Sequence, residues 1–134
     1  MTPLFADAFF FFALWSRGDS FHARVLEHMG KFHGRIVTTR WVLMEVADGL
    51  ADSPLRKKLK RWFDVLESDE TVDVVGFDEA LYGRGLALYD ARPDKGWSLT
   101  DCISFVVMQE RSLTEALTGD RHFEQAGFRA VFAK

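Results

Sequence analysis

Short apolar runs alternate with longer helical stretches along the sequence, and no two of these runs are joined by a hairpin turn. Parallel strands need a long crossover connection, usually a helix, whereas antiparallel neighbours are commonly joined by a tight turn. The alternation therefore predicts an α/β fold with a mostly parallel sheet. Right-handed crossovers place helices on both faces of such a sheet. The five strands are expected at residues 3–7, 35–38, 71–77, 115–119 and 129–133.

The segments between these strands carry residues that favour helix starts. Asp19 or Ser20 suits the N-cap of one helix, and Asp78 suits that of another. Ser53 followed by Pro54 predicts a helix with proline at its first position. Helices are expected over residues 8–16, 20–32, 41–51, 54–68, 79–91, 99–110 and 120–127.

The composition is that of one globular domain covering residues 1–134, with 48% hydrophobic and 28% charged residues. The aromatic run FFFFALW, residues 9–15, is too short to span a bilayer and is interpreted as a core helix. We therefore expect no membrane association. The single Cys102 excludes an internal disulfide, so a reduced, cytoplasmic setting is predicted.

The charge of the chain argues against a plain nucleic-acid-binding module. Its formal net charge is −3, so no global basic field attracts a polyanion. The basic run RKKLKR, residues 56–61, is interpreted as a solvated helix face. An enzyme that gathers its acidic groups around metal ions stays compatible with this charge, because the cations neutralise the acids locally.

Four acidic residues are expected at or just beyond the carboxyl ends of strands, where open parallel sheets bind ligands. Asp7 closes the first strand and Asp120 closes the fourth. Asp101 lies in the first turn of an apolar helix, and Glu45 lies inside another apolar stretch. Each has an ordinary alternative. The aspartates can stabilise helix starts, and Glu45 can share a solvated face with Asp48.

Taken together, the four acids favour a cation site. Carboxylates that converge without a cation repel one another and destabilise the fold. Oxygen ligands suit hard cations such as Mg²⁺ or Mn²⁺. The four histidines are scattered, which disfavours zinc, and no phosphate-binding glycine loop or Ser/His/Asp arrangement is recognisable. Such cations activate water for attack on a phosphodiester, so the acids favour hydrolysis of nucleic acid.

Four motifs resemble those of PIN domains, the fold of the VapC-type toxin ribonucleases of toxin–antitoxin pairs. They are LFADAFFFFAL, TTRWVLMEVADGL, SLTDC and TGDRHF, and they extend over essentially the whole chain. The resemblance implies a PIN-like five-stranded sheet and Mg²⁺- or Mn²⁺-dependent endoribonuclease activity. The catalytic, metal-binding residues that it implies are Asp7, Glu45, Asp101 and Asp120. Ala8-Phe9 is a departure, because many members carry Thr or Ser directly after the first aspartate.

The same resemblance implies groups that orient these acids and partners that the protein binds. Ser98 would cap the helix that presents Asp101, and the Thr118 hydroxyl would orient a carboxylate or a metal-bound water. RNA is the implied substrate, an antitoxin protein is the implied partner, and a homodimer is expected. Four further side chains are candidates for phosphate contacts beside the acids: Arg40, Lys95, Arg121 and His122.

Three alternatives stay open at this point. A PIN-like fold can bind RNA or a protein without cleaving. A receiver-like signalling domain also places aspartates at strand ends, but it needs paired acids after the first strand, and these are missing here. A DNA nuclease can share the acidic site, but it usually carries insertions for which 134 residues leave little room.

Overall fold

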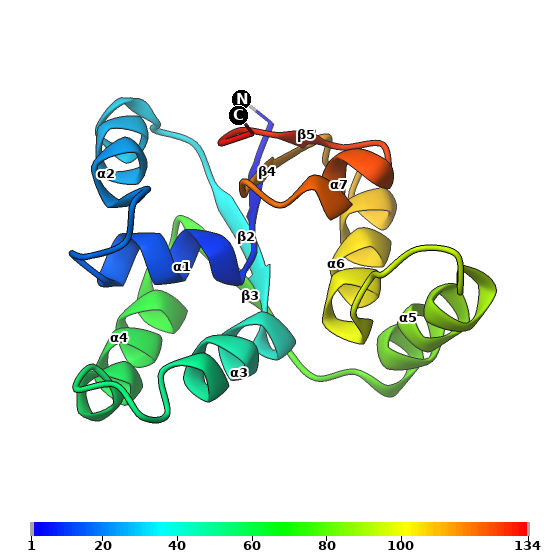
Figure 1. Ribbon diagram of the computed structural model, residues 1–134, viewed down its shortest axis with the longest axis horizontal. Helices are drawn as coiled ribbons and strands as arrows, with labels where there is room; N and C mark the ends of the chain where they lie inside the picture. Colours follow the sequence, from blue (N-terminus) through cyan, green and yellow to red (C-terminus); the bar gives the residue numbers. More distant parts are fainter. Residues whose placement is uncertain (1, 134) are drawn as a thin grey trace.

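The computed structural model describes residues 2–133 and contains one five-stranded sheet (Figure 1). Its order is β3-β2-β1-β4-β5, and every neighbouring pair is parallel. The predicted α/β class with a parallel sheet is therefore confirmed. The strands are β1 (Leu4–Ala6), β2 (Ile36–Thr39), β3 (Val72–Val75), β4 (Glu115–Leu117) and β5 (Arg129–Ala130).

Helices connect all consecutive strands and cover both faces of the sheet, as Figure 1 shows with α1, α2 and α4 on one side and α5, α6 and α7 on the other. They are α1 (Ala8–Trp15), α2 (His22–Lys31), α3 (Arg40–Gly49), α4 (Arg56–Ser68), α5 (Glu79–Ala91), α6 (Leu99–Glu110) and α7 (Arg121–Gln125). Strands β2 and β3 lie on one side of β1, and β4 and β5 lie on the other. The strand order thus reverses between β1 and β4, and such a switch point is where doubly wound sheets bind ligands.

Two predicted helix starts are wrong by about two residues. α4 begins at Arg56 rather than Pro54, because the preceding residues form turns: Ser53 accepts a hydrogen bond from the Leu55 N–H at 3.1 Å. α2 begins at His22, because the Asp19 carboxylate accepts from the Phe21 N–H at 2.8 Å and stabilises the turn before the helix. Both side chains form local hydrogen bonds of the kind that compete with helix formation.

The aromatic run that forms α1 is a core helix, as predicted. Phe10 and Phe11 are buried, and the Trp15 ring packs 5.0 Å, centroid to centroid, from Trp62 of α4. Fully burying one phenylalanine side chain contributes about 1.5–3 kcal/mol to stability, so this helix fixes the chain directly after β1. None of the helices in residues 2–133 is long and apolar enough to cross a membrane.

A second aromatic cluster holds α6 and α7 against the sheet. The Phe105 ring lies 4.9 Å from that of Phe123, which in turn lies 6.3 Å from the ring of Phe5 in β1. All three side chains are fully or almost fully buried. Because α6 and α7 are fixed in this way, their first residues are held beside the carboxyl ends of β1 and β4.

The basic run at the start of α4 forms a solvated face, as the sequence analysis predicts. Leu59 is buried, whereas the five basic residues around it are exposed. Lys60 forms an exposed ion pair with Asp64 one turn later. Exposed pairs of this kind contribute little to stability, about 0–1 kcal/mol.

Candidate active site

Asp7 is the most buried carboxylate at the carboxyl edge of the sheet, with 8% of its surface exposed. It follows β1 directly and precedes α1, but its side chain makes no capping hydrogen bond to that helix. Its Oδ2 accepts a hydrogen bond from the Thr118 hydroxyl at 3.0 Å. Its Oδ1 is buried and has no hydrogen-bond partner among the residues that the structure describes. Asp7 occupies the N-cap position of α1 without a capping hydrogen bond, so helix capping does not account for its burial, and its Oδ1 lacks a partner among the described residues.

Burial raises the pKa of the Asp7 carboxyl well above its ordinary value. The Thr118 hydrogen bond lowers this pKa, and the charges of Asp101 and Asp120 raise it again. A buried oxygen without a partner costs free energy, and so do like charges around it. Asp7 thus has the electrostatic character of a group that lacks a positive partner.

Thr118 connects Asp7 to Asp120. Its hydroxyl is fully buried, donates to Asp7, and accepts a hydrogen bond from the Asp120 N–H at 3.0 Å. The acceptor role leaves the hydroxyl proton free to point at Asp7, so the two bonds are mutually consistent. The Thr118 hydroxyl therefore orients the side chain of Asp7 and the backbone of Asp120.

Asp101 is presented by the first turn of α6. The Ser98 hydroxyl accepts from the Asp101 N–H at 3.0 Å, and Asp101 Oδ2 accepts from the Ser98 N–H at 3.2 Å, which makes a capping box. Asp101 does act as a helix-start residue, as the ordinary alternative states. Nevertheless, burial raises its pKa, and Asp120 adds to this effect against the lowering influence of Ser98 and His122.

Asp120 and His122 complete a tight group with Asp101. Asp120 Oδ1 caps α7 by accepting from the His122 N–H at 2.9 Å. The His122 ring Nδ1 lies 3.2 Å from Asp101 Oδ2 and 3.6 Å from Asp120 Oδ1. Each of the three residues offers a ligand atom within 4.8 Å of the others. This spacing matches the donors of a single cation site.

Glu45 reaches the same region from α3. It is half-buried, and burial raises its pKa, with further increases from Asp101, Asp120 and Asp48. Glu45 lines the same cavity as Asp101 and Asp120, which belong to α6 and the β4–α7 turn. The solvated-face alternative explains only the Asp48 contribution.

All four predicted acids line one cavity of about 360 Å³, which we call the acidic cavity. Its other walls are Ala8, Phe9, Phe12, Gly96, Ser98 and His122. Ala8 and Phe9 are the residues that stand where many PIN domains carry a hydroxyl, so this wall is apolar here. The carboxylates and the unpartnered Asp7 oxygen fit the donor set of a hard divalent cation.

The candidates for phosphate contacts separate into different places. Arg40 forms an ion pair with Glu67 at 2.7 Å on the surface, and Arg121 is exposed. Lys95 does not line the acidic cavity, whereas His122 does. The one sequence signal for His122 was its position two residues after the strand-ending Asp120, and Arg121 beside it carries the same signal but is exposed.

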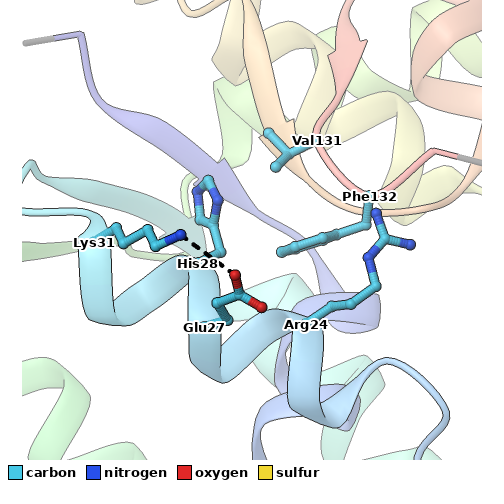
Figure 2. Close-up of a pocket in the computed structure, with 6 residues that line it drawn as sticks. All are labelled: Arg24, Glu27, His28, Lys31, Val131 and Phe132. Carbon is cyan, nitrogen blue, oxygen red and sulfur yellow. Dashed lines mark hydrogen bonds and ion pairs between the residues drawn. The ribbon is translucent and has the colours of Figure 1, made fainter.

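Figure 2 shows a separate cavity between α2 and the residues that follow β5. Its carboxylate, Glu27, already forms an ion pair with Lys31 at 3.3 Å. Arg24 lies over the ring of Phe132, 5.7 Å from its centroid. This cavity has no surplus of acids and therefore lacks the features of a cation site.

Comparisons with known proteins agree with this architecture. The sequence matches the PIN domain family over residues 4–129. No curated protein sequence matches this chain with significance.

Solved structures share the fold at low sequence identity. VapC20 of Mycobacterium tuberculosis, a toxin described as cleaving the sarcin–ricin loop, is 22% identical with a TM-score of 0.87, and the match covers 96% of this chain and 98% of that chain. A toxin–antitoxin complex from Klebsiella pneumoniae is 17% identical with a TM-score of 0.62, covering 89% and 88% of the two chains. FitAcB from Neisseria gonorrhoeae is 18% identical with a TM-score of 0.65, covering 96% of both chains. The family match over most of the length shows that this chain belongs to the PIN domain family.

Proposed function

We propose that residues 1–134 act as a single PIN domain with Mg²⁺- or Mn²⁺-dependent endoribonuclease activity, as the toxin of a toxin–antitoxin pair. The observation that carries this proposal is the buried, unpartnered oxygen of Asp7 beside three further acids. Four neighbouring carboxylates repel one another and destabilise the fold unless a bound cation neutralises their charge, which favours a cation site here. The similarity to VapC20, described as a toxin that cleaves the sarcin–ricin loop, supports ribonuclease over other phosphodiesterase activity.

The four acids would hold the cation in distinct ways. Asp7 and Asp101 are proposed as the main ligands, with Glu45 and Asp120 completing the site directly or through water. When bound, the cation would neutralise charge on the scissile phosphodiester and lower the pKa of an attacking water. Mg²⁺ and Mn²⁺ are the candidates because the donor set is dominated by carboxylate oxygens.

The remaining residues keep these acids in position. Thr118 fixes the Asp7 carboxylate through its 3.0 Å hydrogen bond, and Ser98 fixes the backbone that carries Asp101. His122 holds Asp101 from the other side. Groups of this kind typically change metal affinity or activity by 10–100-fold when they are removed.

A homodimer has a candidate surface formed by α3 and the start of α5. Trp41 packs edge-on against Phe77 with ring centroids 5.2 Å apart, and both line a shallow apolar cavity with Tyr82. Phe77 is 60% exposed and Met44 is 51% exposed. Large exposed apolar groups that gather in this way mark interaction sites. We propose this patch as the contact between two copies, and an antitoxin as a separate partner in line with the toxin–antitoxin complex of similar fold.

The test is cleavage of labelled structured RNA and single-stranded DNA in Mg²⁺, Mn²⁺ or EDTA. Wild type is compared with Asp101→Asn and with Asp64→Asn, a matched change at an exposed position of α4. We expect metal-dependent RNA cleavage that falls at least about 100-fold in Asp101→Asn, because loss of a ligand should exceed the loss of an orienting group. Asp64→Asn should retain wild-type rates.

Two outcomes would contradict the proposal. Equal cleavage by wild type and Asp101→Asn would assign the activity to another nuclease in the preparation. Metal binding without cleavage of any RNA or DNA would favour the alternative, a non-catalytic PIN-like module that binds RNA or protein.

A further inference from the structure

A second cavity lies along the loop that joins α5 to α6, a loop whose path Figure 1 shows. We call it the loop cavity. It measures about 300 Å³ and is lined by Tyr89, Asp90, Arg92, Pro93, Lys95 and Trp97. Gly96 and Ser98 of the same segment line the acidic cavity instead. Alternate residues of the segment 95–98 therefore line different cavities, as expected for an extended chain whose successive side chains point to opposite sides.

The charges around the loop cavity leave one cation free for a ligand. Arg92 forms two hydrogen bonds of 3.0 Å to Asp94, and its guanidinium lies 5.3 Å from the centre of the Trp97 ring. These contacts hold Arg92 in place as part of the wall. Lys95 is half-exposed and forms no ion pair within the described residues 2–133, although its charge adds to the Arg92 hydrogen bond in lowering the pKa of the neighbouring Asp94. Its ammonium group is available to an anion.

Tyr89 gives the loop cavity an aromatic surface. It lies in the last turn of α5, lines the cavity, and is 49% exposed. Exposed aromatic rings beside a cation are the combination by which proteins bind single-stranded nucleic acid, with bases stacked on the rings and phosphates next to Lys or Arg. Asp90 adds a carboxylate that can accept hydrogen bonds from the amino groups of a base.

Between the two cavities, Gly96 presents little steric bulk. This residue has no side chain, and a Cβ placed there would meet only the ring Nε2 of His122, at 4.0 Å. A polynucleotide with its scissile phosphate at the acids can therefore pass over Gly96 into the loop cavity.

On this basis, and resting on the proposed ribonuclease function, we infer that the loop cavity binds a nucleotide next to the scissile phosphate. Its base stacks on Tyr89, and Lys95 binds the phosphate that follows. The basic face of α4 is a weaker candidate for this role, because no residue of α4 is a chain neighbour of one that lines the acidic cavity, whereas Lys95 directly precedes Gly96. Lys31 in the cavity of Figure 2 is already paired with Glu27.

The test uses single-stranded RNA that carries 5-iodouridine at successive positions, bound to the protein with Ca²⁺ in place of Mg²⁺ to slow cleavage. Light should crosslink one iodouridine to Tyr89, which peptide mass spectrometry identifies. Tyr89→Ala should weaken RNA binding about 5- to 100-fold, whereas Tyr89→Phe should bind like wild type, because it keeps the ring that stacks. Lys95→Gln should weaken binding severalfold more than Lys57→Gln, the same charge change at an exposed position of α4.

The outcomes separate this inference from the proposed function. Crosslinking at Tyr89 by a protein that cleaves no RNA in Mg²⁺ would support the loop cavity and refute the nuclease. Cleavage with all crosslinks elsewhere, and unchanged affinity in Tyr89→Ala, would refute the loop cavity alone. Equal effects of Lys95→Gln and Lys57→Gln would show general electrostatic attraction instead of a defined phosphate contact, and no RNA binding at all would overturn both.

Discussion

Replacing Asp7 by asparagine should make the metal-free protein more stable. Asparagine has nearly the same shape and can still accept the hydrogen bond from Thr118, but it removes a charge that is buried beside Asp101 and Asp120. Its amide nitrogen can take the place of Asp7 Oδ1, which has no hydrogen-bond partner within residues 2–133, and this nitrogen carries no negative charge next to Asp101 and Asp120. The change therefore removes a repulsive interaction.

The size of the effect follows from burial. An unpartnered buried polar group costs about 1–3 kcal/mol, and more when it is charged. We therefore expect Asp7→Asn to raise the free energy of unfolding by about 1–3 kcal/mol in EDTA at pH 7.5. The unfolding entropy of a chain of 134 residues is about 0.28 kcal/mol/K, so Tm should rise by roughly 4–10 °C.

Divalent metal should reverse this order. Wild type at a Mn²⁺ concentration 100 times its Kd gains about 2.7 kcal/mol from ligand linkage, whereas Asp7→Asn should gain little because it has lost a main ligand. The assay is thermal unfolding followed by circular dichroism, with and without Mn²⁺. Asp78→Asn is the matched control: Asp78 caps α5 by accepting from the Leu81 N–H, asparagine caps about as well, and its metal response should equal that of wild type.

The reasoning would be refuted if Asp7→Asn were less stable than wild type in EDTA, or if both proteins gained the same stability from Mn²⁺. The first result would mean that the Asp7 charge is compensated within the protein. The second would place the metal elsewhere.

Three further predictions concern the same site and the helices that support it. Thr118→Val should lower the free energy of unfolding in urea by about 1–3 kcal/mol, because it leaves the Asp120 N–H without its acceptor. The same variant should bind Mn²⁺ about 10–100-fold more weakly in calorimetry, whereas Thr118→Ser should preserve both stability and affinity. Because the pKa values of Asp7, Glu45 and Asp101 are raised, the native state binds more protons than the unfolded state above about pH 4. The free energy of unfolding of the metal-free protein should therefore fall as pH rises through these pKa values. A flat profile between about pH 4.5 and 7.5 would contradict the shifts. Gly85→Ala should cost about 1–3 kcal/mol by the same denaturation assay, because its Cβ would overlap Ile103 Cγ1 and lie 3.1 Å from Ile103 Cα. Gly83→Ala on the same helix meets nothing within 4 Å and should stabilise the protein by up to about 1 kcal/mol.

The sequence predicts the sheet and the region of the candidate site well, because both depend on local patterns. Apolar runs without hairpin turns allow little besides a parallel sheet, and parallel strands bring residues such as Asp7 and Asp120 to one edge whatever the helices between them do. The helix starts at His22 and Arg56 were missed because Asp19 and Ser53 are equally good turn residues. Only the folded geometry decides which hydrogen bond forms.

The positions of individual side chains around the site depend on contacts between segments that are distant in the sequence, and local sequence patterns do not predict those contacts. Asp101 both caps α6 and lines the acidic cavity. From the sequence these two roles are treated as alternatives, but in the structure they occur together. His122 joins the acids because Phe123 is buried against Phe5 and Phe105, which orients the short α7. The placement of Lys95 on the far side of Gly96 likewise follows from the path of one loop.

The central claim is that the acidic cavity holds a divalent cation, and the most direct test is anomalous scattering from crystals soaked in Mn²⁺. We predict one or two peaks within about 2.0–2.6 Å of carboxylate oxygens of Asp7 and Asp101, with Asp120 and Glu45 in direct or water-mediated contact. The same peaks should vanish in Asp7→Asn crystals. Manganese bound elsewhere on the protein, with no peak among these four acids, would contradict the account.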